Sequence, residues 1–442
     1  MTAHADPARQ HPAPAGVLAK RYAQVRAQTE ALAAPLSESD CQAQSMPDAS
    51  PVKWHLAHVT WFFETFVLET HEPGFRPHHP AYRVLFNSYY NGVGEQHPRA
   101  QRGLVTRPDL AAVLAWRAAV DARVLTLLTG APSEAVRSLV ELGLQHEQQH
   151  QELVLTDLLH LLSCNPLAPV YRPGWPLAPV ASAPLGWVGS QGGLVGIGHD
   201  GDGFSFDNEG PRHKQFLRPY ALANRLVTHG EWAAFIADGG YRAPRWWLAA
   251  GWDWCRAQQV AAPLYWRPDG SGPGWHCFTL HGLMPIDDGT PITHISCFEA
   301  DAYARWWSAQ HPDQAPARLP TEGEWEHVAA ALPASALAQG NFADTRALHP
   351  MPLRVAAEPG QAAQVFGDVW EWTSGAYQPY PGFRSWDGAV GEYNGKFMVN
   401  QMVLRGGSCA TPRSHVRASY RNFFPTDARW QFNGLRLCRD LD

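Results

Sequence analysis

The sequence predicts a molecule in two parts, an all-helical N-terminal bundle followed by an irregular α+β domain. In the first 165 residues, apolar side chains recur at helical spacing between clear start and stop signals. Beyond residue 186, short apolar runs are broken by Gly, Pro, Asn and Asp. The expected parts are a disordered tail (residues 1–16), the bundle (17–165), a proline-rich linker (166–185) and the second domain (186–442).

Composition excludes several classes of protein. The 442 residues carry 35 basic and 41 acidic side chains, and a net charge of −6 predicts no nucleic-acid partner and no anionic membrane surface. The seven cysteines are scattered without a C-x-x-C pair, which fits neither a disulfide framework nor a zinc ribbon. Neither an apolar leader nor a run of 18 apolar residues is present, so we expect a soluble cytoplasmic protein.

Four long helices account for the bundle. The first is rich in Ala and Leu, and the second follows a possible cap at Asp48 and a proline at its first turn. The connection between the second and third helices, residues 72–106, is long for a bundle and typical of a functional loop. The predicted helices span residues 17–34, 51–70, 107–130 and 132–163.

The fourth helix carries two histidines that could bind one metal ion. His146 and His150 are four residues apart and therefore project from the same helix face, which continues the apolar inner stripe of the bundle. Bundle metal sites are built from facing helices, and the second helix offers His55 and His58. A third imidazole from there would leave positions open for oxygen and substrate. Three imidazoles suit Zn, Fe or Cu.

Two other interpretations of this motif stay open. The pattern H-E-x-x-H is also the zincin motif, in which Glu147 would act as a general base. A zincin needs a further ligand downstream, whereas the third histidine expected here lies upstream. Alternatively, the histidines are hydrogen-bonded core residues without a metal.

Longer motifs resemble known families. WHLAHVTWFFETFVL and LGLQHEQQHQELVLTDLLH are similar to a DinB-like four-helix bundle. RLPTEGEWE (318–326), GDVWEWT (367–373) and the segment 405–437 resemble the formylglycine-generating-enzyme fold, a C-type-lectin-like domain. In this order, the two resemble the non-haem iron sulfoxide synthases of ergothioneine biosynthesis, to which selenoneine synthases are close relatives.

The resemblance implies a reaction that depends on Fe(II) and O₂. Hercynine (trimethylhistidine) would bind beside a thiol or selenosugar donor, and a carbon–sulfur or carbon–selenium bond would form at the imidazole carbon between the two nitrogens. It also implies that His58, His146 and His150 are the iron ligands, with His55 as a competitor of His58, and that Gln149 contacts hercynine. A solvent-facing Gln149 is the plain alternative.

The bundle loop holds a tyrosine pair that one branch of the family uses. By resemblance, a hydroxyl of Tyr89 or Tyr90 supplies a proton or a hydrogen bond during catalysis. Another branch places its tyrosine in the C-terminal domain, where Tyr377 and Tyr380 are the candidates. Simple loop packing is the alternative for the pair.

Further residues are assigned to substrates by the same resemblance. Arg99 and Arg102 are spaced like the arginines that hold the carboxylate of the donor. Asn422, Phe423 and Phe424 match the segment around the quaternary ammonium of hercynine, although some relatives carry Trp and Asp at the two Phe positions. A solvated arginine pair and an ordinary aromatic core are the respective alternatives.

Three rival functions have distinct requirements. Formylglycine generation needs a paired cysteine motif, and Cys409 has no matching second cysteine. A non-enzymatic lectin-like binding protein would not need the histidine stripe. Ovothiol-type synthases usually carry an extra C-terminal methyltransferase domain. The donor itself, cysteine, γ-glutamylcysteine or a selenosugar, is left open by the sequence.

Overall fold

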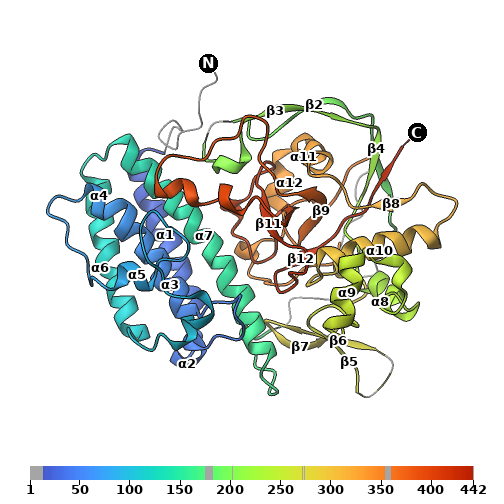
Figure 1. The fold of residues 1–442 in the computed structure, drawn as a ribbon, viewed down its shortest axis with the longest axis horizontal. Helices are drawn as coiled ribbons and strands as arrows, with labels where there is room; N and C mark the ends of the chain where they lie inside the picture. The colour runs from blue at the N-terminus through green and yellow to red at the C-terminus, as the bar shows by residue number, and fades with distance from the viewer. Residues whose placement is uncertain are drawn as a thin grey trace. The chain divides into compact units, whose positions relative to one another are not determined.

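The computed structural model forms two compact units. The first contains the chain up to residue 165 together with two later segments, 200–211 and 381–396, and the second contains the remainder (Figure 1). The described residues are 13–174, 183–201, 203–270, 272, 274–353 and 360–441.

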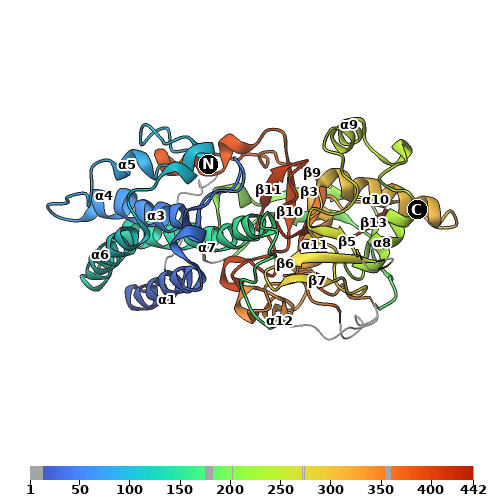
Figure 2. The same cartoon turned by 90° about the horizontal axis from the view of Figure 1, so that it is seen from below.

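The predicted four-helix bundle is confirmed in the first unit. α1 packs on α6 and α7, and α3 packs on the same two helices, so the four run side by side (Figures 1 and 2). The long helices are α1 (Ala15–Ala33), α3 (Val52–Phe62), α6 (Leu110–Thr129) and α7 (Glu134–Ser163); the short ones are α2 (Glu38–Gln42), α4 (Glu69–His71) and α5 (Tyr82–Leu85).

The helix starts follow the sequence signals with one exception. Asp109 accepts the backbone N–H of Ala112 at 2.8 Å and so caps α6, and Ser133 caps α7. The cap expected at Asp48 is wrong, because α3 starts after Pro51 without a side-chain cap. The nearby backbone N–H of Ser50 instead reaches across to a carboxylate of α7.

A π-helical turn, Phe63–Leu68, continues α3 and lies against α7. The close approach depends on Gly143, since a Cβ there would lie 2.5 Å from Cε1 of Phe63. A glycine inside a helix costs about 1 kcal/mol relative to alanine. Its presence three residues before His146 is therefore explained by packing.

A buried ion network joins three helices of the bundle. Glu147 of α7 accepts hydrogen bonds from Arg117 of α6, from Arg26 of α1 at 2.9 Å and from Thr29 at 2.6 Å. Arg26 also binds Asp121 at 2.6 Å. Burial alone would raise the pKa of Glu147, but Arg117 and Arg26 outweigh it and hold the pKa at about 2.

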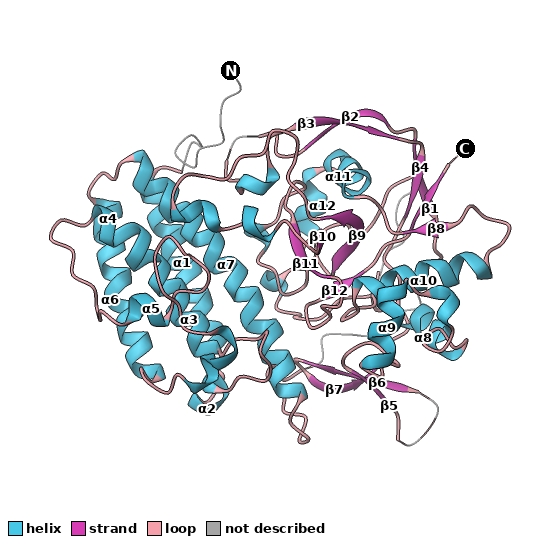
Figure 3. Ribbon diagram, in the orientation of Figure 1, coloured by secondary structure: helices cyan, strands magenta, loops and turns pink. Residues whose placement is uncertain are grey.

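The second unit is built from short strands and long loops, as the sequence predicts (Figure 3). All four residues of β4 are buried, and β4 pairs antiparallel with β1 and with β13. β13 in turn pairs with β8. A second sheet has the order β11-β10-β9-β12. The strands of these sheets are β1 (Trp187–Ser190), β4 (Tyr220–Ala223), β8 (Ala317–Arg318), β9 (Trp370–Ala376), β10 (Gln401–Arg405), β11 (Asn422–Pro425), β12 (Asn433–Gly434) and β13 (Cys438–Asp440).

Two smaller sheets and five α-helices complete the described part of the second unit. β2 and β3 form a hairpin, and β5, β6 and β7 form a three-stranded sheet. Their bounds are β2 (Gly193–Ile197), β3 (His213–Leu217), β5 (Trp266–Pro268), β6 (Trp275–Thr279) and β7 (Gly282–Pro285); the helices are α8 (His229–Ala237), α9 (Ala249–Ala257), α10 (Cys297–Gln310), α11 (Glu322–Ala331) and α12 (Ala334–Gln339).

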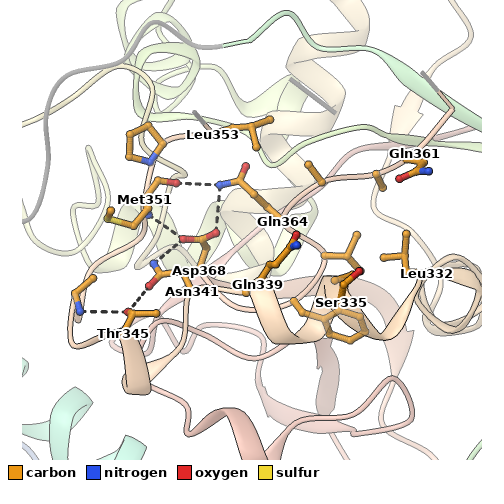
Figure 4. A pocket seen from close by; sticks show the side chains of 18 of the residues that line it. Leu332, Ser335, Gln339, Asn341, Thr345, Met351, Leu353, Gln361, Gln364 and Asp368 are labelled. Carbon is orange, nitrogen blue, oxygen red and sulfur yellow. Dashed lines mark hydrogen bonds between the residues drawn. The ribbon is translucent and has the colours of Figure 1, made fainter. Parts of the chain in front are cut away.

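A cavity of 790 Å³ lies in the second unit beside α12 (Figure 4). Asp368 in its wall accepts hydrogen bonds from the Asn341 side chain at 2.7 Å, the Met351 backbone at 2.8 Å and the Gln364 side chain at 3.2 Å. Burial raises the pKa of Asp368 to about 6. Its bonds tie neighbouring loops together, which makes it a structural carboxylate.

Among the described residues, none of the helices combines the length and the apolar character that a bilayer crossing requires.

Candidate metal centre

Three buried histidines converge in the first unit. His58 of α3 and His146 and His150 of α7 each direct a ring nitrogen to a common point, and these nitrogens lie within 4.8 Å of one another. They form the one such group of metal-binding side chains in the described parts of the chain. The i, i+4 spacing predicted the pair on α7 with either His55 or His58 as a third ligand, and the choice of His58 came from the family resemblance.

The ring of His58 is fixed on both faces and at one edge. It is stacked between Trp54, at a centroid distance of 4.7 Å, and Trp61, at 5.4 Å. Its Nδ1–H donates to the backbone carbonyl of Phe86 at 2.7 Å. In a neutral imidazole the other nitrogen then carries the lone pair. His58 therefore presents Nε2 as a ready-made ligand atom.

The spacing of the ligand atoms fits a metal ion. Nε2 of His58 and Nε2 of His146 are 3.2 Å apart. Two nitrogens bound to one ion at about 2.1 Å would be separated by about 3.0–3.4 Å for bond angles between 90° and 109°. The buried Nδ1 of His146 has no hydrogen-bond partner among the described residues. The donor set and its spacing thus suit a three-histidine site.

His55 does not join this set. Its Nδ1 lies 2.8 Å from Nδ1 of His150, and its Nε2 lies 3.1 Å from Oδ2 of Asp157. The competition between His55 and His58 is therefore resolved by position: His58 is level with His146, whereas His55 lies one turn away, beside Asp157.

Burial keeps the three histidines neutral. It lowers the pKa of His146 to about 3, and it holds the pKa values of His58 and His150 well below the usual range, where the neighbouring imidazoles lower them further. Neutral imidazole is the form that binds metal. At neutral pH, protons therefore do not compete for the ligand nitrogens.

Glu147 cannot act as a zincin base. It is fully buried, and both of its oxygens are occupied by Arg26 and Thr29 of α1 and Arg117 of α6. The zincin interpretation is therefore wrong for this chain, because the residue that would activate water instead anchors the helix.

Gln149 has a neighbour that the sequence did not predict. The hydroxyl of Tyr393 donates to Oε1 of Gln149, and the Tyr393 ring lies 5.6 Å from the His146 ring in an edge-on arrangement. Phe206 stacks on the Tyr393 ring at 5.3 Å. Tyr393 and Phe206 belong to the two later segments of the first unit. No local pattern connects these segments to the bundle.

The predicted tyrosine pair lies beside this group. Tyr89 and Tyr90 stack on each other at 4.6 Å, and burial raises the pKa of both hydroxyls. Tyr90 packs on Trp61 at 5.5 Å, whereas Tyr89 faces Tyr393 at 6.3 Å. Both members of the pair are thus close to Tyr393, Tyr89 through its ring and Tyr90 through the electrostatic influence of Tyr393 on its hydroxyl.

The two arginines have different environments. Arg99 is exposed and donates to the backbone carbonyl of Asp48. Arg102 is buried over the ring of Trp54, 3.4 Å from its centroid, and donates to the Ser50 hydroxyl at 2.9 Å. Burial, reinforced by Arg99, lowers the pKa of Arg102 to about 9. Arg102 adjoins the aromatic wall of His58 through Trp54.

The remaining predicted residues belong to the second unit. Asn422, Phe423 and Phe424 lie on the edge strand β11, opposite β10. Phe423 stacks on Tyr377 at 4.0 Å, and the Tyr380 hydroxyl donates to Glu322 at 3.1 Å. Both alternative tyrosines are thus packed within the second unit.

Comparisons with known proteins identify the class first. The sulfatase-modifying factor enzyme 1-like domain family matches residues 185–441, and the DinB superfamily matches residues 21–154. A formylglycine-generating enzyme of Streptomyces coelicolor is 28% identical, over 58% of this chain and 90% of its own. These matches confirm a DinB-like bundle followed by a formylglycine-generating-enzyme-type domain.

Relatives over the full length specify the family. A hercynine oxygenase of Mycolicibacterium thermoresistibile is 34% identical, over 92% of this chain and 91% of its own. A hercynine oxygenase of Mycobacterium tuberculosis is 31% identical, over 96% and 99%. The chain belongs to the hercynine oxygenase family.

Proposed function

We propose that the protein is an oxidative enzyme that uses Fe(II) and O₂ to join sulfur or selenium to the imidazole C2 of hercynine. The single observation that carries the proposal is the buried set of His58, His146 and His150 in a chain of the hercynine oxygenase family. Bound Fe(II) would supply one coordination sphere in which hercynine, the donor and O₂ meet.

The residues around the histidines support defined roles. Gln149 would contact hercynine, with its side-chain oxygen oriented by the Tyr393 hydroxyl. Tyr393, or one member of the Tyr89 and Tyr90 pair, would supply the proton or hydrogen bond. Burial raises the pKa of the Tyr89 and Tyr90 hydroxyls, which keeps these two protonated at neutral pH. Asn422, Phe423 and Phe424 remain the proposed contacts of the quaternary ammonium group.

The donor would be recognised through Arg102. Its Nε is buried without a hydrogen-bond partner among the described residues, which suits a carboxylate such as that of cysteine or γ-glutamylcysteine. Selenoneine synthesis with a selenosugar donor is the alternative, because such a donor does not need a carboxylate partner. The seven free cysteines are consistent with a reducing, cytoplasmic setting.

One experiment tests the proposal and separates the donors. The Fe(II) enzyme is incubated with hercynine, O₂ and each donor in turn, and the products are identified by mass. We expect a sulfoxide adduct with a thiol donor or a selenium adduct with a selenosugar. The absence of an adduct with every donor would contradict the assignment.

A further inference from the structure

A chain of three side chains leads from Asp157, in the C-terminal half of α7, to the metal-binding histidines. Oδ2 of Asp157 lies 3.1 Å from Nε2 of His55, whose Nδ1 lies 2.8 Å from Nδ1 of His150. All three residues are at most 8% exposed. The same oxygen of Asp157 accepts the backbone N–H of Ser50 at 2.8 Å, which fixes the carboxylate at the start of α3.

The chemistry of these groups sets the direction of each hydrogen bond. An ionised carboxylate only accepts, so the proton between Asp157 and His55 is on Nε2 of His55. The Nδ1 of a neutral His55 then carries a lone pair and accepts from Nδ1–H of His150. The only lone pair left on the ring of His150 is that of Nε2. The two hydrogen bonds therefore select the His150 tautomer that can bind a metal through Nε2.

We propose that His55 and Asp157 are positioning residues that set the tautomer and orientation of His150 and thereby strengthen metal binding. The proposal rests on the metal site put forward above. Partners of this kind typically change metal affinity by about 10–100-fold. For His58, the backbone carbonyl of Phe86 plays the same part: it accepts the Nδ1–H of His58 at 2.7 Å and leaves the lone pair on Nε2.

We call the hydrogen-bonded chain Asp157–His55–His150 the relay. Paired variants test it through the affinity of the full-length protein for Zn²⁺, measured by competition with a chelator. His55→Phe keeps a ring but removes the acceptor for His150, and we expect Zn²⁺ binding to weaken by about 10–100-fold. His55→Asn places an amide oxygen near the former Nδ1, so binding should stay within about threefold of wild type.

A second pair changes the other end of the relay. Asp157→Leu removes the acceptor that holds the proton on His55, so it should also weaken binding, whereas Asp157→Asn retains an oxygen and should weaken it much less. The matched control is His160→Phe, also on α7, where the lost imidazole is bonded to the Ser45 hydroxyl at 2.7 Å. The control should bind Zn²⁺ like wild type.

The result that overturns the relay is Zn²⁺ binding within threefold of wild type in both His55→Phe and Asp157→Leu. If these two variants do not fold, the Zn²⁺-bound wild type decides by nitrogen NMR of labelled histidine. Protons on Nδ1 of His150 and Nε2 of His55 support the relay, and the opposite tautomers refute it. Wild type that binds no Zn²⁺ contradicts the metal site and with it the proposed function.

Discussion

At the scale of single residues, the position of Tyr393 carries the most mechanistic information. Its hydroxyl is bonded to Gln149 and its ring meets the edge of His146, whereas Tyr90 packs against Trp61 and Phe66. A group that acts on the substrate must reach it, and a group that packs the loop need not. The three tyrosines should therefore differ in their effect on turnover.

We predict that Tyr393→Phe lowers kcat by about 10²-fold, in the range expected for loss of a positioned proton donor. Tyr90→Phe should lower kcat by less than about tenfold, because its ring contacts are kept. Steady-state kinetics with hercynine and the active donor measure both. Equal losses in the two variants would refute the distinction.

The candidate site could be predicted in part from these residues. His146 and His150 share a helix face by their spacing, so any correct helix assignment brings them together. His55 and His58 both face α7, and the helical period alone does not separate a ligand from its hydrogen-bond partner. Tyr393 was missed because it lies more than 200 residues beyond α7 in sequence, in a segment without regular periodicity.

At the scale of elements, two devices hold α7 in place: the ion network of Glu147 and the close contact at Gly143. Gly143 and Glu147 lie on either side of His146 in sequence. The motif alone did not predict their roles, because Glu147 resembles a catalytic base and a glycine inside a helix is unfavourable. The motif predicts that His146 and His150 share a face of α7. That Glu147 forms salt bridges instead of activating water is decided by its partners on α1 and α6.

We predict that Glu147→Gln lowers the free energy of unfolding by about 3–5 kcal/mol, because Arg26 and Arg117 lose their buried counter-charge. At low temperature the folded variant should still bind metal, since the three histidines are unchanged. Urea unfolding and metal analysis test the two parts. Metal loss in a fully folded variant would contradict the structural role.

The same network predicts an acid dependence of stability. The pKa of Glu147 is about 2 in the folded chain, below its ordinary value, so its stabilisation is present above about pH 4.3 and is lost as the pH falls toward 2. The shift corresponds to about 3 kcal/mol. Wild type should lose this amount across the acid range, and Glu147→Gln should not. Parallel acid-unfolding curves for the two proteins would refute the assignment.

We predict that Gly143→Ala destabilises the bundle by about 1–2 kcal/mol, because the strain of displacing Phe63 exceeds the gain in helix propensity. The matched control is Gly16→Ala in α1, where the new Cβ meets no atom within 4 Å. The control should be neutral or slightly stabilising in urea unfolding. A stabilised Gly143→Ala would contradict the packing argument.

At the scale of the whole molecule, the first unit combines the bundle with segments from far along the chain. Phe206 stacks on Tyr393, and Asn394 donates to Asp207 at 2.7 Å, so the two later segments also bind each other. Helical periodicity and turn residues predicted the fold class, since these are local signals. The return of segments 200–211 and 381–396 to the first unit depends on long-range contacts that one sequence does not encode locally.

We predict that Glu392 holds the loop of residues 89–94 against the later segment 381–396 of the first unit. Its carboxylate accepts the backbone N–H groups of Gly92 at 2.5 Å and Asn91 at 3.0 Å. Glu392→Ala should raise amide hydrogen exchange around residues 89–94 and leave Zn²⁺ affinity within about twofold. The exposed Glu95→Ala is the control. Unchanged exchange in Glu392→Ala would show that the loop is held by other contacts.

The central claim is that His58, His146 and His150 together hold the iron of the enzyme. The most direct measurement is the iron content of anaerobically reconstituted protein, compared between wild type, single alanine variants of the three histidines and His55→Asn. We predict one iron per chain in wild type and in His55→Asn, and its loss in each alanine variant that remains folded by circular dichroism. Retention of a full iron equivalent in folded His58→Ala and His146→Ala would contradict the account.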